Sequence, residues 1–284
     1  MIKIVNPDKK YLWKFYDLHK FIAFLQNREI FFSRLDSFED EMEICSEELA
    51  YRIMMDYRIA ESPYKNESLS KDVFDEHQRR FLIQLHSLKP IQRLFSASCF
   101  YQSDKESLAM WKLYAGEQGI AIQFNSKEFN ENVIENFNIH LSSEFQLSGR
   151  KMRYVDLTTN SIYDENANIK ALDNTFFPFN KDQSYEHENE YRYVLYGKGV
   201  MEDSRSVGLP IDLDEKYFNF IVSPDTEDWK IYAINKLIKA NGFNKVVEKS
   251  NILTKNVIQK HKLKLFDKVF GDGITVKDAI AKII

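Results

Sequence analysis

The sequence is poor in the features that mark secreted, membrane and disulfide-rich proteins. Its two cysteines, Cys45 and Cys99, lie far apart, so we expect reduced thiols and a cytoplasmic chain rather than a disulfide framework. The opening segment MIKIVNPDKK lacks an apolar stretch of signal-peptide length. No run approaches the roughly 18 apolar residues that a membrane span needs. We therefore expect no membrane partner.

Motifs for metal and phosphate sites are equally scarce. The six histidines are scattered, and neither cysteine lies beside one of them, so a metal site and a Cys–His dyad lack local support. We find no glycine-rich phosphate loop, no dinucleotide-binding fingerprint and no internal repeat. A net charge of -4 excludes a globally basic nucleic-acid-binding protein but leaves room for a local basic groove.

Aromatic side chains, in contrast, are abundant. The 22 phenylalanines and 15 tyrosines predict an aromatic-rich core. A hydrophobic content of 44% with 29% charged residues is typical of a folded globular chain, and 284 residues suffice to bury a large core. We interpret residues 1–284 as a single domain.

The apolar periodicity predicts about seven strands separated by helices, without the regular alternation of a doubly wound fold. We therefore expect an α+β fold with mixed or antiparallel sheets. Residues 41–90 are charged and helical in pattern, which predicts a helical insertion on the main sheet. The expected strands are 12–16, 30–33, 91–100, 120–124, 151–155, 191–196, 217–222 and 245–249, and the other expected helices are 18–26, 106–115 and 226–241.

The most informative stretch is Ser184–Tyr196, SYEHENEYRYVLY. If extended backbone begins at Glu188, then Glu188, Glu190 and Arg192 share one face, with neighbours about 7 Å apart. Two carboxylates and a guanidinium so placed suit a site that holds a ligand hydroxyl or stabilises a developing cation. The alternative interpretation is a charged strand start that faces water.

Other candidates have similar pairs of interpretations. Arg34, with Ser33 before it, suits an anion or ribose contact, or it is an ordinary exposed arginine. Trp111 and Tyr114 lie three residues apart on one helix face, where they stack on a planar base or anchor the core. Lys14 lies between Trp13 and Phe15 and points either into a cleft or to solvent.

Four stretches together resemble a bacterial protein family of unknown function. They are Trp13-Lys14-Phe15; Ile30–Ser33 with Phe38-Glu39-Asp40; Cys99-Phe100 with Met110, Trp111, Tyr114 and Phe124; and Lys181 with Tyr185, Glu188, Glu190, Tyr191 and Arg192. Glu39 and Glu41 stand where the family usually has Asn and Pro. The resemblance spans nearly the whole chain and implies no stated activity.

A second resemblance does imply an activity. A first strand, a helix, a second strand ending in Phe-Ser and a late glutamate opening a strand are similar to ADP-ribosyltransferases, above all the nucleic-acid-modifying toxins. This resemblance implies that NAD is the substrate, that it lies between two small sheets, and that no metal is needed. It assigns catalysis to Glu190. The implied NAD-binding candidates are Lys14, Tyr16, Ser33, Arg34, Trp111, Tyr114, Glu188 and Arg192.

The partners that follow from this hypothesis are NAD and a macromolecular acceptor, which is DNA, RNA or protein. A toxin or antiphage defence effector of this kind also implies an antitoxin or another inhibitory partner. Two alternatives stay open. One is a nucleic-acid-binding or protein-interaction module without catalysis, which uses residues 41–88 and the basic C-terminal segment. The other is a metal-dependent nuclease or hydrolase with Asp40, Glu188 and Glu190 as ligands.

Overall fold

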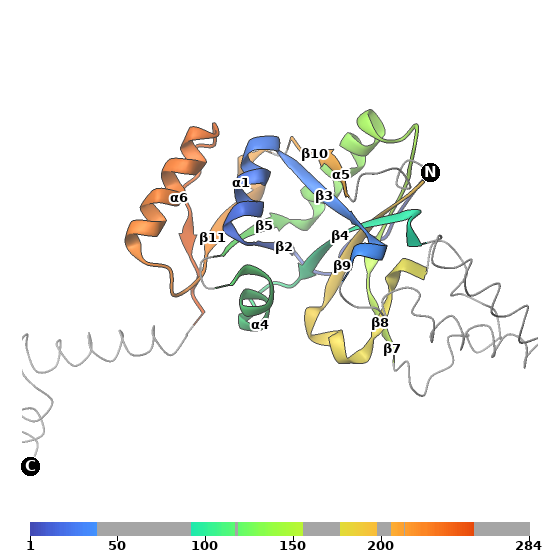
Figure 1. The fold of residues 1–284 in the computed structure, drawn as a ribbon, viewed down its shortest axis with the longest axis horizontal. Coiled ribbons are helices and arrows are strands. Elements are labelled where there is room, and N and C mark those ends of the chain that lie inside the picture. Colours follow the sequence, from blue (N-terminus) through green and yellow to red (C-terminus); the bar gives the residue numbers. More distant parts are fainter. Residues whose placement is uncertain (39–91, 117–118, 156–176, 198–205, 213, 253–284) are drawn as a thin grey trace, which may run out of the picture. The chain divides into compact units, whose positions relative to one another are not determined.

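The computed structural model describes residues 1–38, 92–116, 119–155, 177–197, 206–212 and 214–252. Figure 1 shows the order of its elements. The strands are β1 (Ile2–Ile4), β2 (Tyr11–Tyr16), β3 (Glu29–Arg34), β4 (Phe95–Gln102), β5 (Ile120–Asn125), β6 (Gln146–Lys151), β7 (Arg153–Val155), β8 (Asn180–Asp182), β9 (Glu190–Tyr196), β10 (Ser206–Pro210), β11 (Phe218–Val222) and β12 (Glu248–Lys249). The helices are α1 (Leu18–Asn27), α4 (Leu108–Met110), α5 (Ser126–His140) and α6 (Asp228–Ala240).

The strands form one large mixed sheet and one small sheet. The hydrogen-bonded path of the large sheet is β1-β6-β9-β4-β2-β5-β11-β12, and β3 pairs with β4 and β10 beside this path. The pairs β1–β6 and β11–β12 are parallel, whereas β4–β9, β6–β9, β3–β4 and β3–β10 are antiparallel. β7 and β8 form the small parallel sheet. The mixed sheet with several helices confirms the expected mixed α and β class.

Strand β4 changes partner along one edge. Its N-terminal part pairs with β3, with Ala97 opposite Ser33. Its C-terminal part pairs with β2, with Tyr101 opposite Trp13. We call the stretch between these two pairings, residues 98–100, the β4 fork. The other edge of β4 pairs with β9 from Phe95 to Tyr101, so the fork lies directly beside β9.

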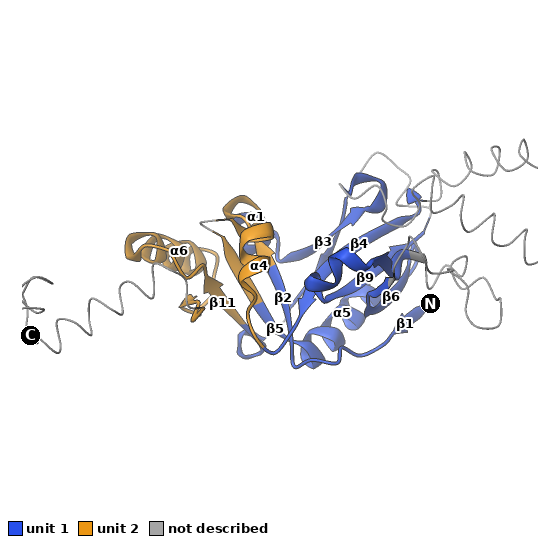
Figure 2. Cartoon of the chain, turned by 90° about the horizontal axis from the view of Figure 1, so that it is seen from below, with its two compact units in different colours: residues 1–14, 22–104, 123–218 blue, residues 15–21, 105–122, 219–284 orange. Residues whose placement is uncertain are grey.

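The chain divides into two compact units, which Figure 2 colours separately. The first consists of residues 1–14, 22–104 and 123–218, and the second of residues 15–21, 105–122 and 219–284. In the first unit, the Phe129 ring stacks on Phe124 at 4.2 Å and lies 5.1 Å from Phe100. In the second unit, Phe220 meets Phe21 edge to face at 5.4 Å. The expected aromatic core is therefore present in each unit.

Several elements lie outside the expected ranges, namely helix α5, strands β1, β8 and β10, and most of β6. In α5, the buried Phe129, Val133 and Phe137 have helical spacing, and this apolar stripe outweighs the weak helix propensity of asparagine. The expected insertion at 41–90 lies wholly outside the described residues. None of the described helices has the length and apolarity to cross a membrane.

Replacing Phe129 by alanine should destabilise the fold by about 3–5 kcal/mol, because the ring is fully buried and its removal leaves a cavity among aromatic neighbours. The matched control is Ile139→Ala in the same helix, where 67% of the side chain is exposed and a change within about 0.5 kcal/mol is expected. Denaturant unfolding of both variants measures the difference. Equal losses would contradict the assignment of the buried face of α5.

Candidate functional site

The segment before β9 folds as a turn and not as a strand. Gln183–Glu188 is a 3-10 helix, capped by the Asp182 side chain, which accepts a hydrogen bond from the Ser184 N–H at 3.0 Å. Asn189 follows in the left-handed region with φ 37°, which asparagine tolerates better than most residues. The prediction that Glu188, Glu190 and Arg192 share one face of an extended strand is therefore wrong for Glu188. This residue ends the 3-10 helix, and the strand begins only after the left-handed Asn189.

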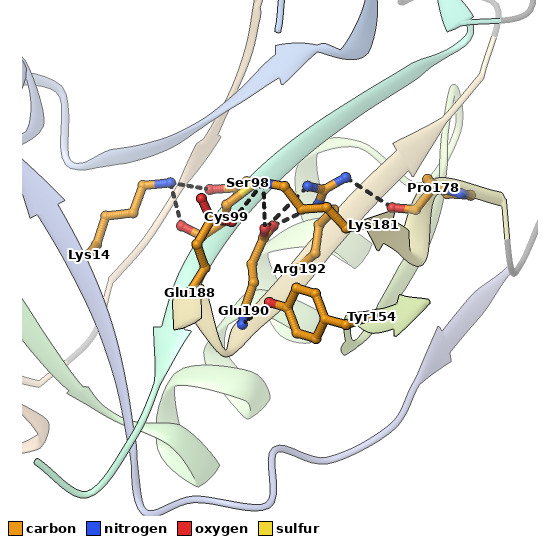
Figure 3. A network of polar contacts seen from close by, with 9 residues as sticks. All are labelled: Lys14, Ser98, Cys99, Tyr154, Pro178, Lys181, Glu188, Glu190 and Arg192. Atoms are coloured by element: carbon orange, nitrogen blue, oxygen red, sulfur yellow. Dashed lines mark hydrogen bonds and ion pairs between the residues drawn. The ribbon is translucent and has the colours of Figure 1, made fainter. Parts of the chain in front are cut away.

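Glu190 and Arg192 form an ion pair within β9, which Figure 3 shows. The Arg192 Nε donates to Glu190 Oε1 at 2.7 Å, and Nη2 donates to Oε2 at 3.2 Å. The third nitrogen, Nη1, donates to the Pro178 carbonyl at 3.0 Å. Arg192 is fully buried and Glu190 is 5% exposed. The interpretation of a solvated strand start is therefore wrong for these two residues.

Lys181, on β8, connects the two glutamates. Its Nζ lies 2.6 Å from Glu188 Oε2 and 3.9 Å from Glu190 Oε2, and it also lies 4.4 Å from the centre of the Tyr185 ring. Lys181 and Glu188 are both buried. The structure thus brings Glu188 near Glu190 through Lys181 and not along one strand face, and the sequence had placed this lysine only within a motif and not at a site.

The surroundings keep Glu190 ionised. Burial alone would raise the pKa of Glu190, but Arg192, then Lys181 and the Cys99 thiol lower it, and the net result is a pKa below the ordinary value of 4.5. The backbone N–H of Glu190 donates to the Tyr154 hydroxyl at 2.7 Å, and burial raises the pKa of Tyr154. Glu190 is therefore a carboxylate at neutral pH, next to a hydroxyl that stays protonated.

Cys99 belongs to the β4 fork, and this fork also contacts Lys14 of β2. The Lys14 ammonium donates to Ser98 Oγ at 3.1 Å and to the Cys99 carbonyl at 2.8 Å, and lies 4.8 Å from the centre of the Phe100 ring. Cys99 pairs with Arg192 across the sheet, and its thiol is one of the groups that lower the pKa of Glu190. Lys14 therefore contacts the Cys99 carbonyl (Figure 3), while its other two partners, Ser98 and Phe100, lie on the sheet face opposite to Glu190.

Ser33 and Arg34 occupy different positions beside β4. Ser33 lies opposite Ala97, which lies opposite Val194, so the alternation of side chains places Ser33 on the sheet face that carries Glu190 and Arg192. Arg34 instead donates from Nε to Asp36 Oδ1 at 2.6 Å. A role for Arg34 in binding an anion stays a prediction, and this aspartate would compete with any anion.

The other three predicted residues, Tyr16, Trp111 and Tyr114, belong to the second unit. Trp111 is buried, its indole N–H donates to Glu106 at 3.0 Å, and its ring meets Phe15 edge to face. This geometry matches the core-anchor interpretation of Trp111. Tyr16 is also buried, and burial raises its pKa, whereas Tyr114 is 45% exposed.

The described residues contain no group of three or more His, Cys, Asp and Glu side chains arranged to hold a metal. Asp40, the third ligand of the metal hypothesis, lies outside the described part of the chain. What Glu188, Glu190 and Lys181 do form is a buried, charge-paired carboxylate centre. Such a centre can accept hydrogen bonds from a ligand hydroxyl and stabilise a cation that develops beside it.

Comparison with protein-family models gives a match to part of the chain. Residues 110–193 match the model of the family described as Protein of unknown function (DUF2971). The match covers less than a third of the chain and includes Glu188, Glu190 and Arg192, and it supports the expected resemblance to a family of unknown function. No curated protein and no solved structure matches the chain. The remaining motifs and the resemblance to ADP-ribosyltransferases stay predictions.

Replacing Arg192 by methionine should cost about 3–5 kcal/mol of unfolding free energy, because it leaves the buried carboxylate of Glu190 without its main partner. The double variant Arg192→Met with Glu190→Met should recover part of this loss, since it removes the uncompensated charge. Denaturant unfolding of the single and double variants gives the coupling. Strictly additive losses would show that the two side chains do not depend on each other.

The lowered pKa of Glu190 also predicts a pH dependence of stability. As the pH falls, the unfolded chain binds the proton first, so the stabilisation by ionised Glu190 is complete above the ordinary pKa and disappears as the pH falls through the lower, folded-state pKa. The difference in unfolding free energy between the native chain and Glu190→Gln should therefore shrink below pH 4.5. Denaturation at a series of pH values measures it, and a constant difference would contradict the ion pair.

Proposed function

We propose that the chain is an ADP-ribosyltransferase-like enzyme that cleaves NAD and transfers ADP-ribose to a macromolecule. The observation that carries the proposal is Glu190, a buried carboxylate at the start of β9 that Arg192 and Lys181 keep ionised. Burial of an ionised carboxylate is costly, and Arg192, Lys181 and Cys99, from three strands, keep Glu190 ionised here. A group held in this state suits a reaction that develops positive charge.

The proposed reaction develops such a charge. The bond between nicotinamide and the ribose carbon breaks, nicotinamide leaves with the electron pair, and the sugar becomes oxocarbenium-like before the acceptor nucleophile bonds to the same carbon and loses its proton. An adjacent carboxylate lowers the energy of this state, as in glycoside cleavage. Glu190 stays ionised throughout and is the proposed electrostatic partner of the sugar.

The carboxylate of Glu190 has capacity for a substrate hydroxyl. Its two oxygens offer about four acceptor positions. The two nitrogens of Arg192 occupy two of them, and Lys181 and the Cys99 thiol also act on this carboxylate. Arg192 also fixes the carboxylate in one orientation, because its planar guanidinium binds both oxygens. A ribose hydroxyl is the further group that we assign to this carboxylate.

The β4 fork supplies further contacts in the proposal. Lys14 donates hydrogen bonds to Ser98 and to the Cys99 carbonyl. Its ammonium is therefore fixed at the β4 fork, between the part of β4 that pairs with β3 and the part that pairs with β2. A fixed ammonium attracts phosphate, and we assign Lys14 to the diphosphate of NAD. Ser33, on the same sheet face as Glu190, is assigned to the ribose or the phosphate. Both assignments extend the predictions from the sequence.

A transferase of this kind would damage the cell that makes it. We therefore propose a role as a toxin or antiphage defence effector, with an antitoxin or another inhibitory partner. The acceptor is DNA, RNA or protein, and the chemistry of Glu190 is the same for each of these.

The test is incubation of the purified chain with labelled NAD and separate pools of DNA, RNA and cell protein. Glu190→Gln should lower label transfer by at least about a hundredfold, because the charge that stabilises the transition state is removed. The matched control is Glu186→Gln, four residues earlier and exposed, which should keep full activity. NAD turnover that survives Glu190→Gln, or no NAD turnover at all, would overturn the proposal, and loss of activity with a chelator would favour the metal hypothesis.

A further inference from the structure

Helix α6, in the second unit, exposes two large aromatic side chains. Trp229 and Tyr232 are each 65% exposed, and their spacing of three residues places them on one face of the helix. The opposite face carries Ile234 and Ile238, which are buried. The aromatic pair is therefore not needed for the packing of α6. Exposed tryptophan and tyrosine on one helix face are typical of an interaction surface.

Each exposed ring has a lysine over it. Lys230 Nζ lies 5.3 Å from the centre of the Trp229 ring, and Lys236 Nζ lies 5.3 Å from the centre of the Tyr232 ring. From residue 229 to 247 the sequence has four lysines and no aspartate or glutamate. Acidic charge is confined to the start of the helix, where Glu227 accepts a hydrogen bond from the Trp229 indole. The surface beyond that point is aromatic and positive, although the whole chain is acidic.

We infer that this face of α6 binds single-stranded nucleic acid. Unpaired bases stack on tryptophan and tyrosine rings, and lysines beside the rings neutralise the phosphates, so one ligand satisfies both features of the surface. An acidic protein segment would meet the lysines but not the flat rings. A membrane surface would require a broad apolar face, and Ile234 and Ile238 of α6 are buried in the protein.

The inference that this face of α6 binds single-stranded nucleic acid does not depend on a reaction with NAD. The further step, that the bound strand is the acceptor of ADP-ribose, rests on the proposed function. It names single-stranded nucleic acid as the acceptor class among the three that the site chemistry leaves open. Because Glu190 belongs to the first unit and α6 to the second, each can be altered separately.

The chain carries its own probe for this test. Trp13 and Trp111 are each 2% exposed, whereas Trp229 is 65% exposed, and these are the three tryptophans of the sequence. Stacking of a base on Trp229 should quench the exposed part of the tryptophan emission. The probe is an oligothymidylate of about 20 nucleotides, which exceeds the roughly 4–16 nucleotides of common single-strand sites. A dye-labelled copy gives the affinity independently by fluorescence anisotropy.

The expected result is saturable quenching by the oligonucleotide, with an affinity that falls as salt rises. Trp229→Ala with Tyr232→Ala should weaken binding about tenfold or more, since each stack contributes substantially. Trp229→Phe should keep the affinity measured by anisotropy but lose the quenching. Lys236→Glu with Lys239→Glu should weaken binding and flatten the salt dependence. The controls on α5 are Ile139→Ala and Lys127→Glu, both at exposed positions, which should leave affinity unchanged.

Several outcomes would overturn the inference. They are no binding by the full chain, binding that the α6 variants leave intact, equal binding of heparin, which has charge but no bases, or preferential binding of anionic lipid vesicles. Glu190→Gln should bind the oligonucleotide as tightly as the native chain. Oligonucleotide binding without NAD turnover would reject the proposed function and keep this surface, whereas NAD turnover without binding at α6 would do the reverse.

Discussion

The candidate site depends on one interaction, the ion pair between Glu190 and Arg192. Both side chains are buried, and a buried ion pair offsets its desolvation cost only when the remaining hydrogen-bonding positions are satisfied. Arg192 meets this condition through the Pro178 carbonyl and lies 5.6 Å from the Phe38 ring. Glu190 meets it through the Cys99 thiol. Three separate segments of the first unit, which carry Phe38, Cys99 and Pro178, therefore contact or influence two side chains of β9.

The same pair determines what the neighbouring groups can do. Lys181 lies closer to Glu188 than to Glu190, so the second carboxylate shares its cation with the first and the two charges are balanced through one ammonium. Tyr154 contacts the Glu190 backbone and positions the start of β9 without engaging the carboxylate. The result is one ionised carboxylate with a fixed orientation, which is the property that the proposed chemistry requires.

Part of this arrangement could be predicted from the sequence and part could not. The spacing of Glu190 and Arg192 places them on one face of a strand, and this local rule succeeded. The position of Glu188 could not be predicted, because it depends on the backbone reversal at Asn189. Cys99 reaches the site through the pairing of β4 with β9, which are far apart in sequence. Lys181 is near Glu188 in sequence, but their contact depends on the 3-10 turn between them. No local pattern contains that information.

The fold shows the same division between local and distant causes. Strand β9 and helix α6 were found within a few residues of their observed bounds because their apolar patterns are clear. Helix α5 was not predicted, although Phe129, Val133 and Phe137 mark its buried face. Its asparagines have weak helix propensity, and the segment therefore did not have the composition of a helix. The β4 fork was not predictable, because residues of β2, β3 and β9 must all be placed before β4 has its neighbours.

The pairing of β4 with β9 also determines at which stage of synthesis the site can form. Glu190 pairs with Tyr101 of β4. Lys14, which also contacts β4, is made near the start of the chain. At about 5–20 residues per second of synthesis, several seconds pass on the ribosome between the completion of β4 and the appearance of β9. A nascent chain in that interval has the Lys14 side of the site and no carboxylate, so a harmful activity centred on Glu190 would arise only once β9 has been made and paired.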